Sequence, residues 1–211
     1  MVFPCRLIRN HQKGIGNTIM AFTFTLMGLP QCGKTTVGMN YMNLIGQEDG
    51  FVFLDGDIVR TELQNLDFSQ TARINHIKYI AYMCRLVNEL GVNVIAAFSL
   101  PNDKIRQTFK KHCLTSKFIW CKAELDKMVE RAKADPSKYQ RNSKDTPEAV
   151  IKRTLSNGMW ETPLQPDLIL DTTDCEIDKF GVGNNRSEEI NMLLGFYIWS
   201  CLHPKNHVFI Q

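Results

Sequence analysis

Residues 27–36 read MGLPQCGKTT, and this stretch decides the fold. It follows AFTFTL at 21–26, a run of β-forming residues, and precedes VGMNYMNLI at 37–45, which is patterned as a helix. Gly28 to Thr35 satisfies the pattern G-x-x-x-x-G-K-[ST], and a preceding strand with a following helix is the context that this motif requires. The sequence therefore predicts a phosphate-binding loop that joins a first strand to a first helix.

The positions of this loop have separate physical roles. Gly28 and Gly33 let backbone N–H groups turn inward around an anion, because glycine has no Cβ atom in the way. The helix that begins near Lys34 adds the equivalent of about +0.5 charge at its N-terminus. Lys34 can reach the β- and γ-phosphates of ATP, the Thr35 hydroxyl can ligate Mg²⁺, and Thr36 packs or caps at the helix start. We therefore expect ATP and Mg²⁺ as ligands.

The rest of the chain alternates short apolar runs with longer helical patterns. Strands are predicted at 21–27, 51–54, 92–98, 117–121 and 167–170, and helices at 34–46, 57–65, 70–90, 101–112, 124–133 and 146–155. The strands show little alternation of polar and apolar residues, which indicates a parallel sheet covered on both faces. We predict the α/β class, as a three-layer P-loop NTPase fold with a mostly parallel five-stranded sheet.

The length of 211 residues with 44% hydrophobic residues fits one domain with a real core. We expect residues 1–19 to be a disordered extension, or an over-called start, because Met20 stands directly before the first strand. Residues 20–180 form the predicted P-loop domain, and 181–211 comprise a flexible connection at 181–187 and a C-terminal helix that docks on this domain. The polar segment 133–147 is either a solvated loop or a mobile lid over the site.

Composition restricts the compartment and the partners. The seven cysteines include no CxxC pair, so we expect a reduced, cytoplasmic protein without structural zinc. The net charge is only +3 and the basic residues are scattered along the chain, which argues against a nucleic-acid surface. The most apolar run, 192–202, is too short to span a bilayer, so no membrane partner is expected. Cys32, inside the phosphate loop, is either a small apolar filler or a thiol acidified by the helix terminus.

Two carboxylates follow the second predicted strand, in FLDGDIVR at 53–60. Ligands of open parallel sheets bind at the carboxyl ends of the strands, so Asp55 and Asp57 would face the nucleotide. One carboxylate can hold Mg²⁺ through water, and the other can accept a proton from an attacking hydroxyl. The alternative is that Asp57 only caps the helix that follows. We favour the functional interpretation over the capping one, because the pair follows a phosphate loop.

Five segments occur in an order that resembles the adenylylsulfate kinase family. They are GLPQCGKTT, FLDGDIVR, LDFSQTAR, VIAAFSLP and WETPLQPDLILDT, and they span about residues 20–172. The resemblance implies transfer of the γ-phosphoryl group of ATP to the 3′-hydroxyl of adenylyl sulfate, a step of sulfate activation. The most specific segments are DGDIVR and the late ETPLQPDLILDT run.

The resemblance also implies roles for single residues. Phosphate-loop roles fall on Gly28, Gly33, Lys34, Thr35 and Thr36. Asp57 is similar to the family's metal-associated, base-like acid, and Asp55 supports it. The resemblance thus implies a catalytic set of Asp57, Asp55 and Lys34, with Thr35 and Asp57 serving the metal. Arg60 and Arg73 match arginines that bind the phosphosulfate end of the acceptor, a task that suits a bidentate guanidinium. Phe68 matches the aromatic residue that stacks on the acceptor's adenine, although core packing is its plain alternative.

Departures from the family cluster on the acceptor side. Where the family reads DRxENIRRIG, this chain has ARINHIKYIA at 72–81, so His76 stands at the position of the acceptor-binding Asn. The family's AFISPYR becomes AFSLPND, which keeps Pro101 but places Asn102 and Asp103 where Tyr and Arg are expected.

The lid motif RDxKGLYKKA is also altered. From Arg131 onward this chain has RAKADPSKYQRN, in which Lys138 and Tyr139 keep approximate positions. We therefore assign acceptor binding to Arg60, Phe68, Arg73, His76, Pro101 and Lys138, and the kinase class follows more firmly than the acceptor.

Three hypotheses remain open from the sequence. The first is an adenylylsulfate kinase with a small-molecule nucleotide acceptor, for which a homodimer stays open. The second is a P-loop kinase for another nucleotide conjugate, a sugar or a polynucleotide end. The third is an ATP-binding module whose altered lid no longer assembles a closed site.

Overall fold

The computed structural model describes residues 20–45, 50–64, 69–134, 146–156, 159–176 and 183–203. Its sheet contains β1 (Thr23–Met27), β2 (Phe51–Asp55), β3 (Asn93–Phe98), β4 (Ser116–Lys122) and β5 (Leu168–Asp171). The strand order is β2-β3-β1-β4-β5, and every pair of neighbours is parallel. The predicted α/β fold with a five-stranded parallel sheet is confirmed.

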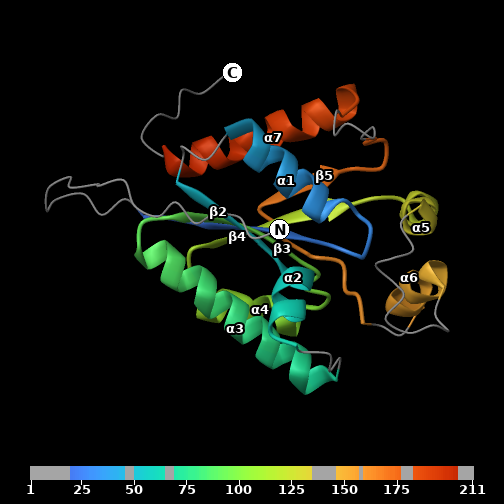
Figure 1. Cartoon of the computed structure of the whole chain (residues 1–211), viewed down its shortest axis with the longest axis horizontal. Helices are drawn as coiled ribbons and strands as arrows, with labels where there is room; N and C mark the ends of the chain where they lie inside the picture. The colour runs from blue at the N-terminus through green and yellow to red at the C-terminus, as the bar shows by residue number, and fades with distance from the viewer. Residues whose placement is uncertain are drawn as a thin grey trace, which may run out of the picture.

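Helices cover both faces of this sheet (Figure 1). On one face lie α1 (Lys34–Ile45) and α7 (Asn185–Leu202), and on the other lie α3 (Gln70–Glu89) and α4 (Asp103–His112). The short α2 (Gly56–Glu62) follows β2 directly, while α5 (Leu125–Ala134) and α6 (Pro147–Ser156) lie together at one end of the sheet. The strands end on this same side, so the loops that carry the sequence motifs converge there.

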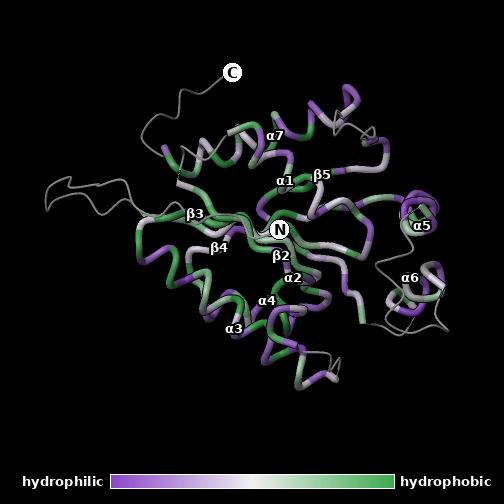
Figure 2. The backbone as a smooth tube through the Cα atoms, in the orientation of Figure 1, coloured by the Kyte–Doolittle hydropathy of each residue, from purple (hydrophilic) through white to green (hydrophobic). Residues whose placement is uncertain are grey.

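The core consists of two apolar layers, one on each face of the sheet. Phe24 and Leu26 of β1 belong to the layer shared with α1 and α7, whereas Val94 and Ala96 of β3 belong to the layer shared with α3 and α4. In Figure 2 the central strands are mainly hydrophobic and the hydrophilic residues lie on the outer helices. Two buried faces explain why the strands read as nearly continuous apolar runs.

Helix α1 approaches the sheet closely because of Gly38. A Cβ atom at this position would lie 2.5 Å from the Phe53 ring and 3.0 Å from Leu26. The missing side chain therefore lets the helix lie directly on β1 and β2. This close packing fixes the start of α1, and with it the phosphate loop, at the carboxyl end of β1.

Two predicted boundaries are wrong for identifiable reasons. The fourth helix was expected from 101 but begins at Asp103, because Asn102 caps it by accepting a hydrogen bond from the Ile105 N–H at 3.0 Å. The flexible connection was expected through 187, yet α7 begins at Asn185. Asn184 caps this helix by accepting from the Ser187 N–H at 3.0 Å. Both caps are asparagines that the apolar pattern does not register.

Helix α7 packs against α1, and its buried residues Ile190, Leu194 and Ile198 belong to the same core layer as Phe24. Within the described ranges, no helix combines the length and the apolar character that crossing a membrane requires. The predicted extension at 1–19 lies outside the described residues.

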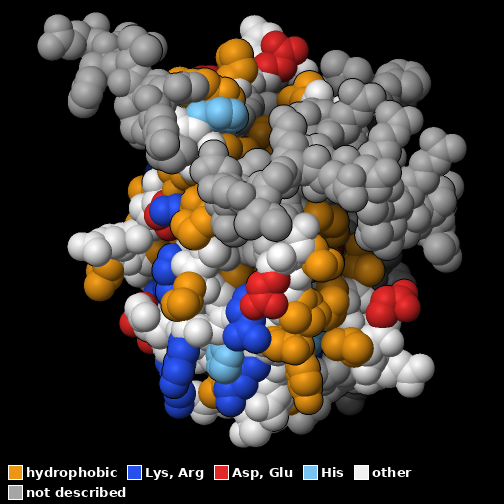
Figure 3. Space-filling view, turned by 90° about the vertical axis from the view of Figure 1, so that its left-hand side faces the viewer, with side chains coloured by type: hydrophobic (Ala, Val, Ile, Leu, Met, Phe, Trp, Pro, Cys, Tyr) orange, Lys and Arg blue, Asp and Glu red, His pale blue; other side chains and the backbone are white. Residues whose placement is uncertain are grey.

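The opposite end of the sheet, where the strands begin, carries a mixed surface. Figure 3 shows this side, on which hydrophobic side chains stand next to Lys and Arg side chains. The exposed hydrophobic residues of α3 include Tyr79, Tyr82, Met83 and Leu86, and the exposed Leu90 follows the helix as its C-cap. This face lies away from the phosphate loop, which is found at the carboxyl ends of the strands.

Candidate active site

The phosphate loop has the backbone conformation that its glycines allow. Gly28 has φ 152° and Gly33 has φ 84°, and Gln31 between them is also left-handed at φ 63°. A Cβ atom at Gly28 would lie 2.3 Å from the carbonyl oxygen of Cys121 and 2.5 Å from Sγ of Cys32. A side chain at Gly28 would therefore collide with the core residues beneath the loop, so the tight turn requires glycine here.

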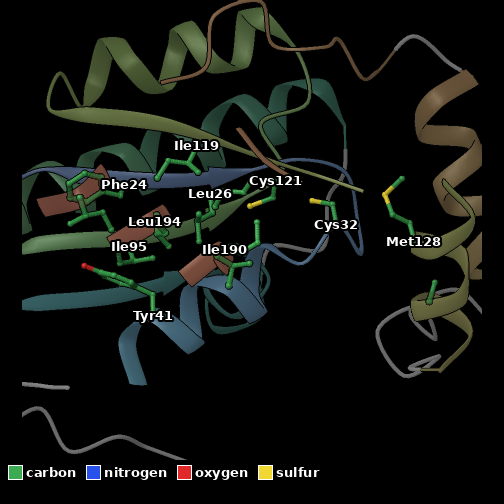
Figure 4. Packing of buried hydrophobic residues seen from close by; sticks show 14 of the residues in the cluster. Phe24, Leu26, Cys32, Tyr41, Ile95, Ile119, Cys121, Met128, Ile190 and Leu194 are labelled. Carbon is green, nitrogen blue, oxygen red and sulfur yellow. The ribbon is translucent and has the colours of Figure 1, made fainter. Parts of the chain in front are cut away.

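Cys32 lies at the base of this loop rather than in its opening. Its side chain is 1% exposed and belongs to the core layer that contains Cys121. Figure 4 shows both residues at the end of this layer, with the sulfur of Cys32 on the side that faces Cys121. Of the two interpretations left open by the sequence, the small apolar filler fits this position.

Two long-range contacts, which sequence reasoning missed, hold the loop carbonyls. Thr172 donates its hydroxyl hydrogen bond to the Cys32 carbonyl at 2.9 Å, with the Lys122 carbonyl as a second acceptor at 3.1 Å. Arg131 donates to the carbonyl of Gln31 at 3.4 Å and to that of Thr172 at 2.6 Å. Thr172 is the last residue of the LILDT run, so the motif included this residue but did not indicate that its hydroxyl holds the phosphate loop. Arg131 opens the altered lid segment.

Arg131 also donates to the carbonyls of Thr173 and Cys175, at 3.2 and 2.9 Å. It thereby ties α5 to the loop after β5. Beside these contacts is a cavity of about 220 Å³, whose lining includes Gly33, Thr36, Arg131, Cys175 and Asn191. The cavity adjoins the phosphate loop, which is where the rest of a bound nucleotide would lie.

The two functional side chains of the loop have defined partners. Lys34 Nζ donates to the Leu29 carbonyl at 2.6 Å and lies 3.6 Å from Sγ of Cys32. Its ammonium group is therefore folded back over the loop. The Thr35 hydroxyl donates to Oδ2 of Asp55 at 2.6 Å, which joins the phosphate loop to the carboxyl end of β2.

Asp55, not Asp57, is the N-cap of α2. Its Oδ1 accepts from the N–H groups of Asp57 at 2.8 Å and Ile58 at 3.3 Å, and the residue is 7% exposed. The alternative in which Asp57 only caps the helix is therefore wrong. Asp57 is exposed in the first turn of α2, so its carboxylate can meet a ligand.

The oxygen groups at this point fit a magnesium ion. Mg²⁺ prefers carboxylate, hydroxyl and phosphate oxygens and retains several waters. The Thr35 hydroxyl and the Asp55 carboxylate lie in contact, and the Asp57 carboxylate is two residues away in the chain. Among the described residues no cluster of three or more His, Cys, Asp or Glu side chains could hold a metal alone. The site would therefore need the oxygens of the nucleotide.

His76 comes close to the acidic turn. It is 3% exposed on α3, and its Nδ1 atom is buried without a hydrogen-bond partner. Burial lowers the pKa of His76, and the nearby charge of Arg60 lowers it further, while a hydrogen bond to the Gly56 backbone and the charge of Asp57 act in the opposite direction. The imidazole is therefore held in its neutral form.

The two predicted anion-binding arginines both precede this histidine in the chain, Arg60 on α2 and Arg73 on α3. Arg60 is 8% exposed on α2, and burial lowers the pKa of Arg73 on the first turn of α3. Pro101 follows β3, and its carbonyl accepts from the Glu161 N–H at 2.7 Å. Phe68 and Lys138, like the central part of the predicted lid, lie outside the described residues.

The residues that replace the family's acceptor-side Tyr and Arg have structural tasks. Asn102 caps α4, as described above. The backbone N–H of Asp103 donates a hydrogen bond to Oε2 of Glu161 at 2.8 Å. The residues that depart from the family pattern at this point therefore fix the start of α4 in this chain.

Comparison with known proteins places this geometry in a family. The adenylylsulphate kinase family model matches residues 20–171. A protein of Aeropyrum pernix described as "Probable adenylyl-sulfate kinase" is 31% identical over 165 residues, covering 72% of this chain and 84% of that protein. The adenylyl-sulfate kinase of Acaryochloris marina is 27% identical over 176 residues, covering 81% and 80%.

Two solved structures share the fold. The APS kinase CysC of Mycobacterium tuberculosis in complex with AMPPNP and APS has a TM-score of 0.66 at 20% identity, covering 86% of this chain and 99% of that one. A gluconokinase from Sinorhizobium meliloti has a TM-score of 0.60 at 14% identity, covering 89% and 99%. Because kinases for different acceptors share this architecture, the fold alone does not select the acceptor. The family match over most of the chain is decisive: the chain belongs to the adenylylsulphate kinase family, whose members are phosphotransferases that use ATP and act on a hydroxyl group.

Proposed function

We propose that the chain transfers the γ-phosphoryl group of ATP to the 3′-hydroxyl of adenylyl sulfate, giving ADP and 3′-phosphoadenylyl sulfate. The observation that carries the proposal is the contact between Thr35 and Asp55, at 2.6 Å. It brings the phosphate loop and the acidic turn together at the carboxyl ends of β1 and β2. Such a junction can bring a donor phosphate and an acceptor hydroxyl together.

The residues of this junction have complementary tasks in the proposed reaction. Lys34 leaves the Leu29 carbonyl to bind the β- and γ-phosphates. Thr35 and Asp55 hold the metal side, in place of the predicted pair of Thr35 and Asp57, because the Asp55 carboxylate is the one in contact with the Thr35 hydroxyl. Mg²⁺, when bound, offsets the charge that develops on the phosphate oxygens. Asp57 accepts the proton of the attacking hydroxyl while the bond from the γ-phosphorus to the β-phosphate oxygen breaks. Positioning and charge stabilisation supply most of the rate in this kind of transfer.

The acceptor end of the proposed site is basic. Arg60 and Arg73 suit a sulfate or phosphate group, because guanidinium binds tetrahedral oxyanions in a bidentate way. Phe68 and Lys138 stay predicted acceptor contacts through the resemblance to the family. The proposal of a small-molecule acceptor follows from this arrangement, and a homodimer remains compatible with it.

A different acceptor is the second candidate, because of His76. This residue stands where the family has an acceptor-binding Asn, yet its Nδ1 atom is buried without a partner. An imidazole in place of an amide changes which hydrogen bonds an acceptor can make. The candidate acceptors are another nucleotide conjugate, a sugar or a polynucleotide end.

A transfer assay separates these possibilities. Purified protein is incubated with γ-³²P-ATP, Mg²⁺ and either adenylyl sulfate, gluconate, adenosine 5′-phosphate or a 5′-hydroxyl oligonucleotide. We expect label on adenylyl sulfate, and loss of the label in Lys34→Ala and Asp57→Ala. Label on another acceptor but not on adenylyl sulfate would refute the proposed substrate while leaving the kinase class intact. ATP binding without transfer to any acceptor would support the non-catalytic alternative.

A further inference from the structure

The turn between β3 and α4 forms a wall shared by both halves of the site. Strand β3 lies between β1 and β2, so its carboxyl end reaches the gap between the phosphate loop and the acidic turn. The Gly28 N–H donates to the Ser99 carbonyl at 3.4 Å. On the other side, Gly56 of the acidic turn packs against the ring of Phe98, the last residue of β3 before the turn, so closely that a Cβ atom at Gly56 would collide with it. A movement of this turn would displace both loops.

The turn contains a strained residue. Leu100 has φ 37°, a left-handed backbone angle, and its side chain is fully buried. A residue other than glycine is strained in such a conformation and keeps it only where its surroundings enforce it. Strain of this kind, directly before the predicted substrate contact Pro101, requires an identifiable restraint.

Arg106 supplies the restraint from inside α4. Its side chain is 6% exposed, and its guanidinium donates to the Leu100 carbonyl at 3.2 Å and to the Glu161 carbonyl at 2.9 Å. The carboxylates of Asp103 and Glu161 lie 3.8 and 3.9 Å away and balance its charge. One planar group thus ties the turn, the helix and the segment after α6 together.

Glu161 closes the arrangement from the opposite side. Its N–H donates to the Pro101 carbonyl at 2.7 Å, and its Oε2 accepts from the Asp103 N–H at 2.8 Å. The carbonyls of Leu100 and Pro101 are therefore both held, one by each member of the pair. The pair of Arg106 and Glu161 is called the turn clamp below.

We propose that Arg106 and Glu161 are positioning residues for phosphoryl transfer. They hold the strained Leu100–Pro101 turn in the place where it supports the acidic turn and borders the acceptor. The inference rests on the proposed function, because it assumes that the acceptor lies against Pro101. The inference adds to the site two residues that need not touch a substrate. It predicts that their loss weakens the use of the acceptor more than the binding of ATP.

Arg106→Lys and Glu161→Gln test the turn clamp, with Arg85→Lys as the matched control. Arg85 is exposed on α3 and pairs with Glu89 at 3.3 Å, so a lysine there leaves the site intact. For Arg106→Lys we expect the KM for adenylyl sulfate to rise and kcat to fall, each about five- to tenfold, while the KM for ATP stays within about twofold. Glu161→Gln keeps its backbone N–H and an acceptor oxygen, so we expect a smaller change in the same direction.

Amide hydrogen exchange over residues 98–102 provides a readout that needs no acceptor. Exchange should rise in Arg106→Lys and stay at the wild-type rate in Arg85→Lys. Unchanged exchange in Arg106→Lys overturns the inference. Raised exchange also overturns it if kcat and the KM values for both substrates stay within twofold of wild type, because the turn clamp would then have a purely structural role. An equal rise in both KM values also contradicts it. If the wild type does not phosphorylate adenylyl sulfate, the proposed function fails. The same kinetic split, measured with the acceptor that the wild type does use, then decides the inference together with exchange.

Discussion

The Thr35 hydroxyl donates a hydrogen bond to Oδ2 of Asp55 at 2.6 Å, while Oδ1 of the same carboxylate caps α2. One buried side chain therefore serves two loops that carry different parts of the chemistry. The cap fixes where α2 starts, and this in turn fixes the direction in which Asp57 leaves the helix. Through this single residue, the folding of a short helix and the alignment of the phosphate loop depend on each other.

Replacing Asp55 separates these two tasks. Asn is as good a helix cap as Asp, so Asp55→Asn is expected to keep the free energy of unfolding within about 1 kcal/mol of wild type, whereas Asp55→Ala loses about 1–2 kcal/mol. Without the carboxylate charge, transfer should fall about 10–100-fold in Asp55→Asn and require more Mg²⁺. Urea unfolding and transfer rates over a Mg²⁺ titration measure the two effects. Wild-type Mg²⁺ dependence in Asp55→Asn would remove Asp55 from the metal side of the site.

Asp57, unlike Asp55, should contribute to transfer alone and not to the stability of α2. It is exposed, so Asp57→Asn is expected to change the free energy of unfolding by less than about 0.5 kcal/mol. A lost general base lowers transfer about 10²–10⁴-fold, and the KM for ATP should change little because the phosphate loop is untouched. Steady-state kinetics with urea unfolding on the same samples give both quantities. Transfer within threefold of wild type would assign the base to another residue.

The fold could be predicted because its signals are local. Apolar runs such as 92–98 predicted the strands, and the motif at 28–35 predicted the loop that joins β1 to α1. The lack of polar–apolar alternation in the strands predicted their parallel pairing. The two helix starts that were wrong depend on Asn102 and Asn184, whose caps arise from one side-chain oxygen each. Periodicity averages over a whole helix, so it cannot see a single capping contact.

The site was predictable where the residues are neighbours in sequence, and not where they meet through the fold. Lys34, Asp55 and Asp57 belong to contiguous motifs, and the structure brings them to one edge of the sheet. The contact of Thr172 with the Cys32 carbonyl joins residues 140 positions apart. No spacing rule reports such a pair, and the same holds for Arg106 and Glu161.

His76 predicts a pH dependence of stability. Burial and Arg60 lower its folded-state pKa below the usual value of about 6.5. As the pH falls below about 6.5, the unfolded chain binds a proton that the native protein does not, so the free energy of unfolding decreases until the folded-state pKa is reached. His76→Asn and His76→Gln should reduce this slope by up to about 1.4 kcal/mol per pH unit.

Urea unfolding at pH 5.5, 6.0, 6.5 and 7.5 measures the slope for both variants. A slope identical to wild type would show that the imidazole is solvated in the native protein. Transfer assays on the same variants add a functional comparison, because Asn is the family's residue at this position. If His76 contacts the acceptor as proposed, the KM for adenylyl sulfate changes in His76→Asn while the KM for ATP does not.

Thr172 provides the sharpest test of what holds the phosphate loop in place. Replacement by Val removes its hydroxyl and replacement by Ser keeps it, so the two variants together measure the effect of that hydroxyl. Thr172→Val keeps the volume but leaves the buried Cys32 carbonyl without this donor, which costs about 1–3 kcal/mol of stability. The freed loop should bind ATP more weakly, with the KM for ATP raised about tenfold and the KM for the acceptor nearly unchanged. Thr172→Ser retains the donor and should stay within about threefold of wild type in both KM values, since only a methyl group is lost. Kinetics and urea unfolding on the two variants decide the matter: equal KM values for ATP in the Val and Ser variants would mean that the hydroxyl does not hold the loop in its binding conformation.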